Sequence, residues 1–369
     1  MGCKRVVVKV GTSTITHPTE QLNLMRMERL VRELADIHSQ GIETLLVTSG
    51  AIGVGVARFG LREPPQTIPM KQAMAAVGQG TLMHMYEKFF AEYGKIVAQV
   101  LVTKDDFSER LRYINGRNTL LTLLSLGVIP IINENDTVVT DEIRFGDNDT
   151  LSALVAGAAD ADLLVILSDI DGLYDDDPRL NPAARRLPEV HEISAELEEH
   201  SKTRGTRMAS GGMYTKLIAA RMVMAAGIPM VIAHGAEDNV LHRVLAGEET
   251  GTVFVPRENR MQARKHWIAF AGSPQGEIIV DQGAYEAIRR RGKSLLPAGI
   301  AAVRGRFERG NVVSLLSPEG KEFARGIANY SAEEIARIAG RKTSQIEKIL
   351  GSKDFDEVIH RNNLTLYEA

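Results

Sequence analysis

Two lysines beside glycine-containing turns carry the clearest chemical signal in this sequence of 369 residues. Lys9 lies inside the apolar run at residues 5–10 and is followed by a Gly-Thr-Ser turn, and Lys216 follows a Ser-Gly-Gly turn at residues 210–212. A lysine among apolar residues is costly unless its charge has a partner. Glycine turns let backbone N–H groups approach an anion closely. Both segments therefore predict contact with a polyphosphate.

Carboxylate and amide side chains gather between residues 133 and 149. The segments are Asn-Glu-Asn-Asp at 133–136 and Gly-Asp-Asn-Asp at 146–149, and they follow an apolar strand predicted at residues 129–133. A solvated acidic loop would have the same composition, but the position at a strand end favours a polar pocket. A carboxylate in such a pocket can hold an ammonium group or organise cationic side chains.

Two further polar segments follow predicted strands. Residues 47–55 form a glycine-rich turn that leads into a helix, whose first N–H groups would bind a carboxylate or phosphate. Residues 167–174 carry Ser168, Asp169 and an Asp-Gly-Leu-Tyr sequence. Together with the two lysines, these segments fit phosphoryl transfer, which requires positioning and charge neutralisation above all.

Other chemistries lack their residues. The sequence has no Walker A loop, no protein-kinase motif set and no Gly-x-Ser-x-Gly elbow. Its nine histidines have no metal-ligand spacing, and we interpret His234, which follows a strand, as structural. Cys3 is the only cysteine, which excludes an intrachain disulfide and a cysteine-based metal cluster.

Short β-branched runs alternate with helical patterns through the first 255 residues. This alternation predicts an α/β fold, with a mainly parallel sheet sandwiched by helices. In such a sheet the carboxyl ends of the strands meet at one edge, where ligands bind. The polar segments all follow predicted strands or open helices. Strands are predicted at residues 5–10, 44–47, 96–102, 129–133, 163–167 and 229–233, and helices at 24–40, 67–90, 150–159 and 213–226.

Charge divides the chain. The net charge is −3, but residues 261–369 hold 17 basic and 13 acidic side chains, which leaves 27 basic and 34 acidic in the first 260. Short strands separated by glycine turns in the tail predict a small, mixed, β-rich module. We expect domains at residues 1–258 and 275–369.

No apolar run approaches the roughly 18 residues of a membrane span, and the N-terminus lacks a signal-peptide pattern, so we expect a cytoplasmic protein.

The ordered motifs resemble the amino-acid kinase family, specifically its branch that acts on glutamate, and the tail resembles a PUA domain. The kinase motifs are Lys9-Val10-Gly11-Thr12-Ser13, Thr48-Ser49-Gly50-Ala51, Asn133-Glu134-Asn135-Asp136, Gly146-Asp147-Asn148-Asp149, Asp171-Gly172-Leu173-Tyr174 and Gly211-Gly212-Met213-x-Thr215-Lys216. The tail motifs are Val280-Asp281-x-Gly283-Ala284, Ser294-Leu295-Leu296-Pro297-x-Gly299, Ala324-Arg325-Gly326, Asn329-Tyr330-Ser331 and Val358-Ile359-His360-Arg361.

The resemblance implies an amino-acid kinase fold and ATP-dependent phosphorylation of the γ-carboxylate of L-glutamate, the first step of proline biosynthesis. It implies that Lys9 and Lys216 neutralise the transferring phosphoryl group and that Asp149 orients both lysines. It assigns glutamate binding to Ser49, Asp136 and Asn148. The ATP-binding residues that it implies are Lys9, Gly11, Ser168, Asp169, Ser210, Gly211, Gly212, Met213, Tyr214, Thr215 and Lys216.

The same resemblance implies Mg²⁺ as cofactor, with its ligands undefined by the sequence, proline as a feedback inhibitor, and a homodimer or homotetramer. Two alternatives remain open at this point. One is a related kinase that acts on aspartate, acetylglutamate, carbamate or a nucleotide. The other is RNA binding by the tail, although we interpret the tail's basic residues as a solvated face.

Overall fold

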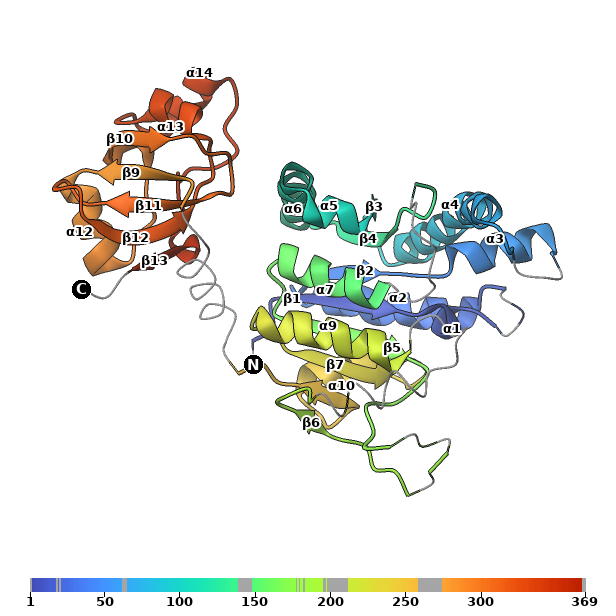
Figure 1. Ribbon diagram of the computed structural model, residues 1–369. Coiled ribbons are helices and arrows are strands. Elements are labelled where there is room, and N and C mark those ends of the chain that lie inside the picture. The colour runs from blue at the N-terminus through green and yellow to red at the C-terminus, as the bar shows by residue number, and fades with distance from the viewer. Residues whose placement is uncertain are drawn as a thin grey trace. The chain divides into compact units, whose positions relative to one another are not determined.

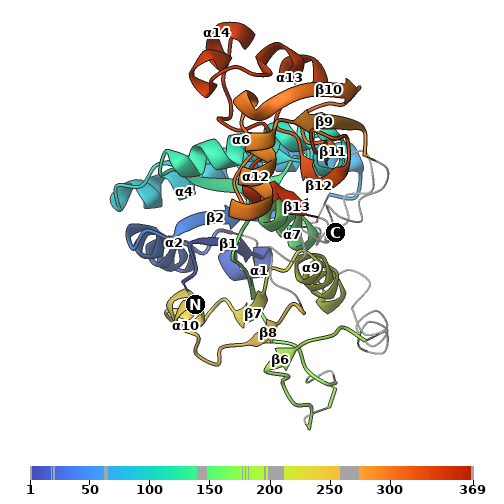
Figure 2. The same cartoon turned by 90° about the vertical axis from the view of Figure 1, so that its left-hand side faces the viewer.

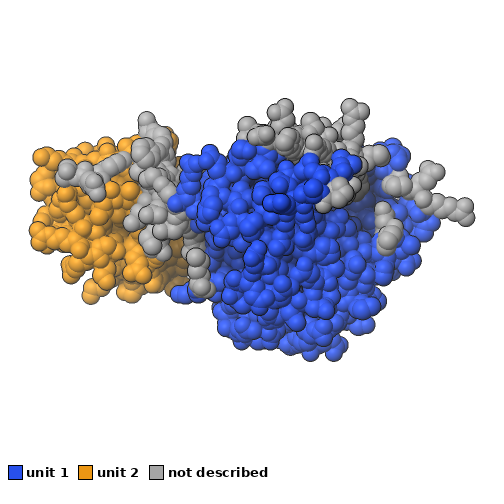
Figure 3. All heavy atoms as spheres, turned by 90° about the horizontal axis from the view of Figure 1, so that it is seen from below, with its two compact units in different colours: residues 1–257 blue, residues 258–369 orange. Residues whose placement is uncertain are grey.

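The structure is a computed structural model of the whole chain. It describes residues 2–366 except 18, 20, 62–64, 139–147, 177, 179, 182, 195–196, 198–211 and 258–273. The chain forms two compact units, Met1–Arg257 and Glu258–Ala369, which Figure 3 colours separately. Each unit has hydrophobic clusters of its own.

The first unit is built on a sheet whose eight strands are parallel except at the β7–β8 pair. The inner strands consist mainly of β-branched and leucine residues, because both faces of the sheet are buried. Figure 1 shows these strands side by side. Their spatial order is β3 (Val97–Val102), β4 (Ile129–Glu134), β2 (Glu43–Val47), β1 (Arg5–Val10), β5 (Leu163–Ser168), β7 (Met230–His234), β8 (Thr252–Phe254) and β6 (Glu189–Val190).

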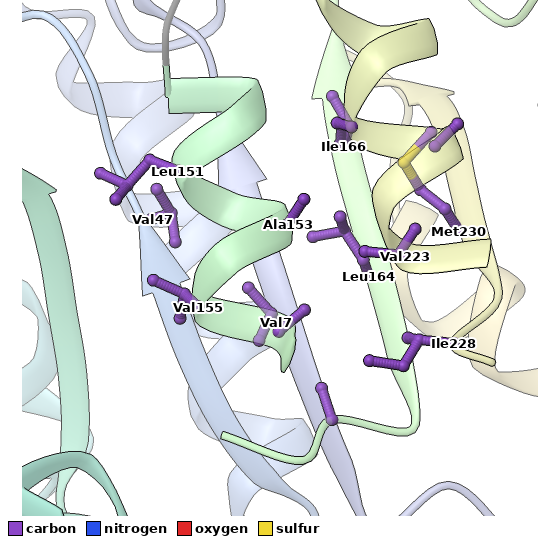
Figure 4. Packing of buried hydrophobic residues seen from close by; sticks show 14 of the residues in the cluster. Val7, Val47, Leu151, Ala153, Val155, Leu164, Ile166, Val223, Ile228 and Met230 are labelled. Carbon is purple, nitrogen blue, oxygen red and sulfur yellow. The ribbon is translucent and has the colours of Figure 1, made fainter. Parts of the chain in front are cut away.

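Helices cover both faces of this sheet. On one face, α6 (Arg110–Ser125), α7 (Asn148–Ala158) and α9 (Met213–Ala225) share a core with alternate strand residues. Figure 4 shows side chains of α7 and α9 packed over Val7, Val47, Leu164 and Met230.

The opposite face is covered by α2 (Leu24–Ser39), α4 (Ile68–Glu92) and α10 (Val240–Ala246). Figure 2 shows α2 and α10 on the other side of the strands from α7 and α9. Three further helices of the described residues lie in connections after strands: α1 (Thr12–Ile15) after β1, α3 (Ala51–Phe59) after β2 and α5 (Lys104–Ser108) after β3.

The second unit is a five-stranded mixed sheet with its own apolar core. Strands β9 and β11 are parallel and the other pairs are antiparallel. The spatial order is β10 (Ile300–Gly305), β9 (Gly276–Val280), β11 (Val312–Leu316), β12 (Glu322–Ile327) and β13 (Leu364–Leu366). Helices α12 (Gln282–Arg291), α13 (Ala332–Ile338) and α14 (Ile346–Leu350) contribute apolar residues to the same core.

The predicted fold class is confirmed: a mainly parallel sheet lies between helical layers, and a small mixed module follows. The structure also contains helices that the periodicity did not indicate, notably α6, whose sequence carries Asn115, Gly116 and Asn118. These residues have low helix propensity, which tertiary packing overrides here. In the described part of the chain, no helix has the length and apolar character needed to cross a lipid bilayer.

Candidate active site

Two buried lysines meet one buried carboxylate at the carboxyl edge of the sheet. Lys9 Nζ lies 2.7 Å from Asp149 Oδ1, and Lys216 Nζ lies 3.3 Å from Asp149 Oδ2. The three residues are 5%, 4% and 0% exposed in the order Lys9, Lys216 and Asp149. One negative charge thus faces two positive charges, so the cluster carries a net positive charge that suits an anionic ligand.

The pKa shifts in this cluster follow from its charges and its burial. Burial alone would raise the pKa of Asp149, but the charges of Lys9 and Lys216 outweigh it and hold that pKa below its ordinary value. Burial lowers the pKa of Lys216, and the Asp149 charge opposes this effect. Asp149 is therefore ionised at neutral pH, which keeps it available to orient both ammonium groups.

Each member of the cluster comes from a different element. Lys9 is the penultimate residue of β1, which lies between β2 and β5. Asp149 is in the first turn of α7, where the helix dipole favours a carboxylate. Lys216 is in the first turns of α9, where the dipole disfavours a cation, so Asp149 or a bound anion must compensate.

The start of α9 adds further contacts to Asp149. Thr215 Oγ1 donates a hydrogen bond to Asp149 Oδ2 at 2.7 Å. Thr215 also bonds the backbone oxygen of Gly212, the residue that precedes α9. Met213 and Tyr214 follow in the first turn, so the predicted ATP-binding segment from Gly212 to Lys216 is brought to the cluster. Ser210 and Gly211 lie outside the described residues.

The other predicted nucleotide residues lie beside β1. Gly11 directly follows β1, and a Cβ added at this position would have Lys9 Nζ as its nearest neighbour, 3.7 Å away. Ser168 ends β5, and its hydroxyl contacts the Asp169 carboxylate at 3.1 Å. The Asp169 charge also favours the protonated form of Lys216. These residues therefore share one end of the central strands.

A network of amides and hydroxyls occupies the neighbouring strand ends. Asn148 Nδ2 lies within hydrogen-bond distance of three oxygens, which share its two hydrogens: Thr48 backbone O at 2.7 Å, Ser49 Oγ at 2.8 Å and Asn133 Oδ1 at 2.9 Å. Ser49 precedes Gly50, whose φ of 98° favours glycine and which caps α3. Because Asn148 and Asp149 are adjacent in α7, the amide network adjoins the lysine cluster.

Asp136 follows β4 and is half-buried. Burial raises the pKa of its carboxyl group to about 6. A cationic ligand would stabilise the ionised form of this carboxylate and so offset the cost of burying its charge. The described contacts do not link Asp136 to Asn148 or Ser49.

Sequence reasoning did not single out Gln79 or Tyr86, both on α4. Gln79 accepts a hydrogen bond from Asn133 at 2.8 Å, and the Tyr86 hydroxyl bonds Thr48 Oγ1 at 2.9 Å. Neither residue belongs to a recognisable motif. The only signal in the sequence is their occurrence as polar groups on the helical face of Leu82, a spacing that predicts burial.

No resident metal site is evident in the residues that the structure describes. Among them, no group of three or more His, Cys, Asp or Glu side chains is arranged to hold a metal ion. Both Asp149 oxygens already face lysine ammonium groups. The arrangement is better suited to neutralising phosphate oxygens than to binding a bare cation.

The site thus consists of two lysines and two helix starts at the carboxyl edge of a mainly parallel sheet. Comparison of the chain with known proteins identifies its family. The model of the amino acid kinase family matches residues 4–234, and that of the PUA domain matches residues 276–350. The chain belongs to the amino acid kinase family, which is a family of phosphotransferases.

Its relatives include several proteins named glutamate 5-kinase. The protein of Moorella thermoacetica is 57% identical over 361 residues, which cover 98% of this chain and 96% of that protein. The protein of Caldanaerobacter subterraneus subsp. tengcongensis is 53% identical and covers 99% of this chain and 98% of its own length. The protein of Carboxydothermus hydrogenoformans is 52% identical, with the same coverage.

Proposed function

We propose that this chain uses ATP to phosphorylate the γ-carboxylate of L-glutamate, giving L-glutamyl 5-phosphate in the first step of proline biosynthesis. The glutamate 5-kinases related to it match along nearly their whole length, the second unit included. The single structural observation that carries the proposal is the Lys9–Asp149–Lys216 cluster, which adjoins an amide-lined region suited to an amino acid.

On the donor side, Lys9 and Lys216 bind the ATP phosphates and neutralise the charge that develops on the transferring group. Asp149 holds both ammonium groups in place and does not itself transfer a proton. The predicted nucleotide residues Gly11, Ser168, Asp169 and the described segment 212–216 would lie around the phosphates. Because the lysines approach Asp149 from β1 and α9, they can contact the phosphoryl group from two directions.

On the acceptor side, Ser49, Asn148 and Asp136 bind glutamate. Asp136 suits the α-ammonium group, since its carboxylate is half-buried and gains from a cation. Ser49 and Asn148 are hydrogen-bonded to each other, and Asn148 adjoins Asp149 in α7. This adjacency would bring the acceptor next to the phosphoryl group.

The chemistry needs no general base, because a glutamate γ-carboxylate is already ionised and nucleophilic at neutral pH. A carboxylate oxygen attacks the γ-phosphorus, and the bond from that phosphorus to the β–γ bridging oxygen breaks, with ADP as the leaving group. We propose direct in-line transfer without a covalent enzyme intermediate. The residues of this chain position the two substrates and stabilise the transferring charge.

We propose that Mg²⁺ reaches the site bound to ATP, held by phosphate oxygens and water. Asp149 is engaged by both lysines, and the described residues offer no cluster of metal ligands, which fits a cation carried by the nucleotide better than one held by the protein. When bound, Mg²⁺ would add to the shielding of phosphate charge that the lysines supply.

The experiment that tests the function is an ADP-release assay with L-glutamate, L-aspartate, N-acetyl-L-glutamate, carbamate and UMP as acceptors. We expect turnover with glutamate and, with hydroxylamine present, a γ-glutamyl hydroxamate. Turnover of another acceptor without turnover of glutamate would refute the proposal and favour a different member of the family.

We further propose that proline inhibits the enzyme and that the protein is a homodimer or homotetramer. Proline shares the α-carboxylate and the cationic nitrogen of glutamate, so groups that bind glutamate's α-carbon substituents can bind proline. Inhibition by proline that weakens as glutamate rises, and light scattering of the purified chain, would test the two statements.

A further inference from the structure

We propose that Gln79 is a positioning residue for the acceptor substrate: it orients the Asn133 amide and, through Asn133, the acceptor-binding amide of Asn148. The inference rests on the proposed function in one respect, the assignment of Asn148 to the acceptor. It adds a residue from the middle of a long helix that belongs to no motif of the site.

Gln79 is held in place by close packing of α4 against α3. The preceding residue, Gly78, lies so near α3 that a Cβ at this position would be 1.8 Å from the Ala51 backbone oxygen. A Cβ at Gly55 of α3 would likewise be 2.0 Å from the Met74 oxygen of α4. Because the two backbones nearly touch at Met74 and Gly78, in the helical turns that lead up to Gln79, its side chain starts from a rigid position next to the turn that carries Ser49.

From that position Gln79 makes one polar contact, in a buried environment. Its side chain is 8% exposed, and its Oε1 accepts a hydrogen bond of 2.8 Å from Asn133 Nδ2. Asn133 is 2% exposed, so water cannot readily replace a lost partner. A buried amide N–H that loses its acceptor retains the cost of desolvation, which gives this contact an influence on how Asn133 is oriented.

The orientation of Asn133 determines which atom faces Asn148. With Asn133 Nδ2 bound to Gln79, Asn133 Oδ1 faces Asn148 Nδ2 at 2.9 Å and also accepts from the Glu134 backbone N–H. Rotation of the Asn133 amide by half a turn would set one NH₂ group against another. The Glu134 N–H can only donate, so it determines which end of the Asn133 amide is the oxygen, and Gln79 Oε1 holds the Nδ2 end of that amide in place.

Asn148 then presents its side-chain oxygen as a hydrogen-bond acceptor in a defined position. Its Nδ2 is engaged by Asn133, Thr48 and Ser49, and its Oδ1 is buried with no hydrogen-bond partner among the described residues. A buried oxygen of this kind suits a donor group of the substrate, such as an ammonium. The inferred order of influence is therefore Gln79, Asn133, Asn148 and substrate.

The test is Gln79→Met, which keeps the length of the side chain and removes its acceptor. We expect the KM for the acceptor to rise about tenfold, as the loss of one buried hydrogen bond implies, with kcat and the KM for ATP within about threefold of wild type. The matched control is Leu82→Met, on the same buried face of α4, which should lower the melting temperature without changing either KM.

A double variant separates positioning from packing. If Gln79 acts through Asn133, Gln79→Met should add little to the acceptor KM of an Asn133→Ala enzyme, whereas independent effects would multiply. An unchanged acceptor KM in Gln79→Met, or equal changes in both KM values together with a lowered melting temperature, would overturn the inference.

The ADP-release assay of the wild-type protein with the panel of substrates distinguishes a failure of this inference from a failure of the proposed function. If another acceptor replaces glutamate, the proposed function fails and the KM of that acceptor becomes the quantity that Gln79→Met must change. A crystal structure of the variant gives a readout that needs no turnover. We expect a displaced or rotated Asn133 amide, and an unaltered Ser49–Asn148–Asn133 network would also overturn the inference.

Discussion

At the scale of single residues, the two lysines are predicted to act on the same phosphoryl group. Lys9→Met and Lys216→Met each remove one ammonium group and leave Asp149 paired with the other lysine. We expect kcat to fall by about 10²–10³-fold in each variant, as when other groups that stabilise a transition-state charge are removed. Steady-state assays measure this loss, and circular dichroism should show a folded protein. Near-normal turnover in either variant would contradict the role of that lysine.

Asp136 combines a cost in stability with its proposed role in binding glutamate. Burial raises its pKa from 3.8 to about 6, so the folded protein favours the protonated form and the ionised carboxylate destabilises the free enzyme above that pH. Asp136→Asn should therefore stabilise the free protein at pH 8 by about 1–3 kcal/mol. This gain should shrink as the pH falls from about 6 to 3.8 and vanish below that value. Thermal unfolding across this pH range measures it.

Protonation of the same carboxylate should lower kcat/KM at acid pH. Because only the ionised form pairs with an ammonium group, kcat/KM for glutamate in the wild type should fall as the pH drops through about 6. Asp136→Asn should have a low kcat/KM and lack this decrease. A variant that binds glutamate normally would show that another group holds the ammonium.

At the scale of elements, we expect the crossing of α3 and α4 to support the proposed glutamate-binding site. Gly78→Ala would place a methyl group 1.8 Å from the Ala51 oxygen, so the helices must separate. We expect a loss of about 1–3 kcal/mol in the free energy of unfolding and a higher KM for glutamate, because Ala51 adjoins the turn that carries Ser49. Urea unfolding and initial rates measure the two effects.

The matched control is Gly80→Ala, two residues further along α4. Gly80 is exposed, and a Cβ there would meet no atom within 4 Å. Its replacement should leave the KM unchanged and stabilise the helix by up to about 1 kcal/mol, the difference in helix propensity between the two residues. Equal behaviour of the two variants would argue against the close helix crossing as a support of the site.

The central strands and part of the candidate site could be predicted from the sequence. The central strands were predicted because a parallel sheet buried on both faces requires continuous β-branched runs, as in β1 and β5. Lys9 and Lys216 stood out because each conflicts with its local environment, one in an apolar strand and one near a helix start. Gln79 could not be recognised in this way, because a glutamine is not unusual in a helix. Its partner Asn133 is 54 residues away, and only the folded structure brings the two amides together.

At the scale of the whole molecule, the two units divide the charge and the predicted chemistry unequally. The acidic excess lies in the first 260 residues, which include Asp136 and Asp149, and the basic excess lies in the tail. Every described residue that we assign to the substrates belongs to Met1–Arg257. Each unit also has a core of its own, so neither depends on the other for its buried apolar surface.

A chain that ends at Arg257 should therefore fold and retain the kinase activity. The apolar clusters on both faces of the eight-stranded sheet are contained within this segment, which predicts a cooperative unfolding transition in the isolated unit. We expect kcat and both KM values within about threefold of those of the full chain, since we propose that Lys9, Lys216 and Asp149 supply most of the catalysis through charge neutralisation and positioning. Calorimetry and the ADP-release assay measure these quantities. A folded but inactive unit would mean that the tail contributes directly to the site, and it would move the search for substrate contacts to the second unit.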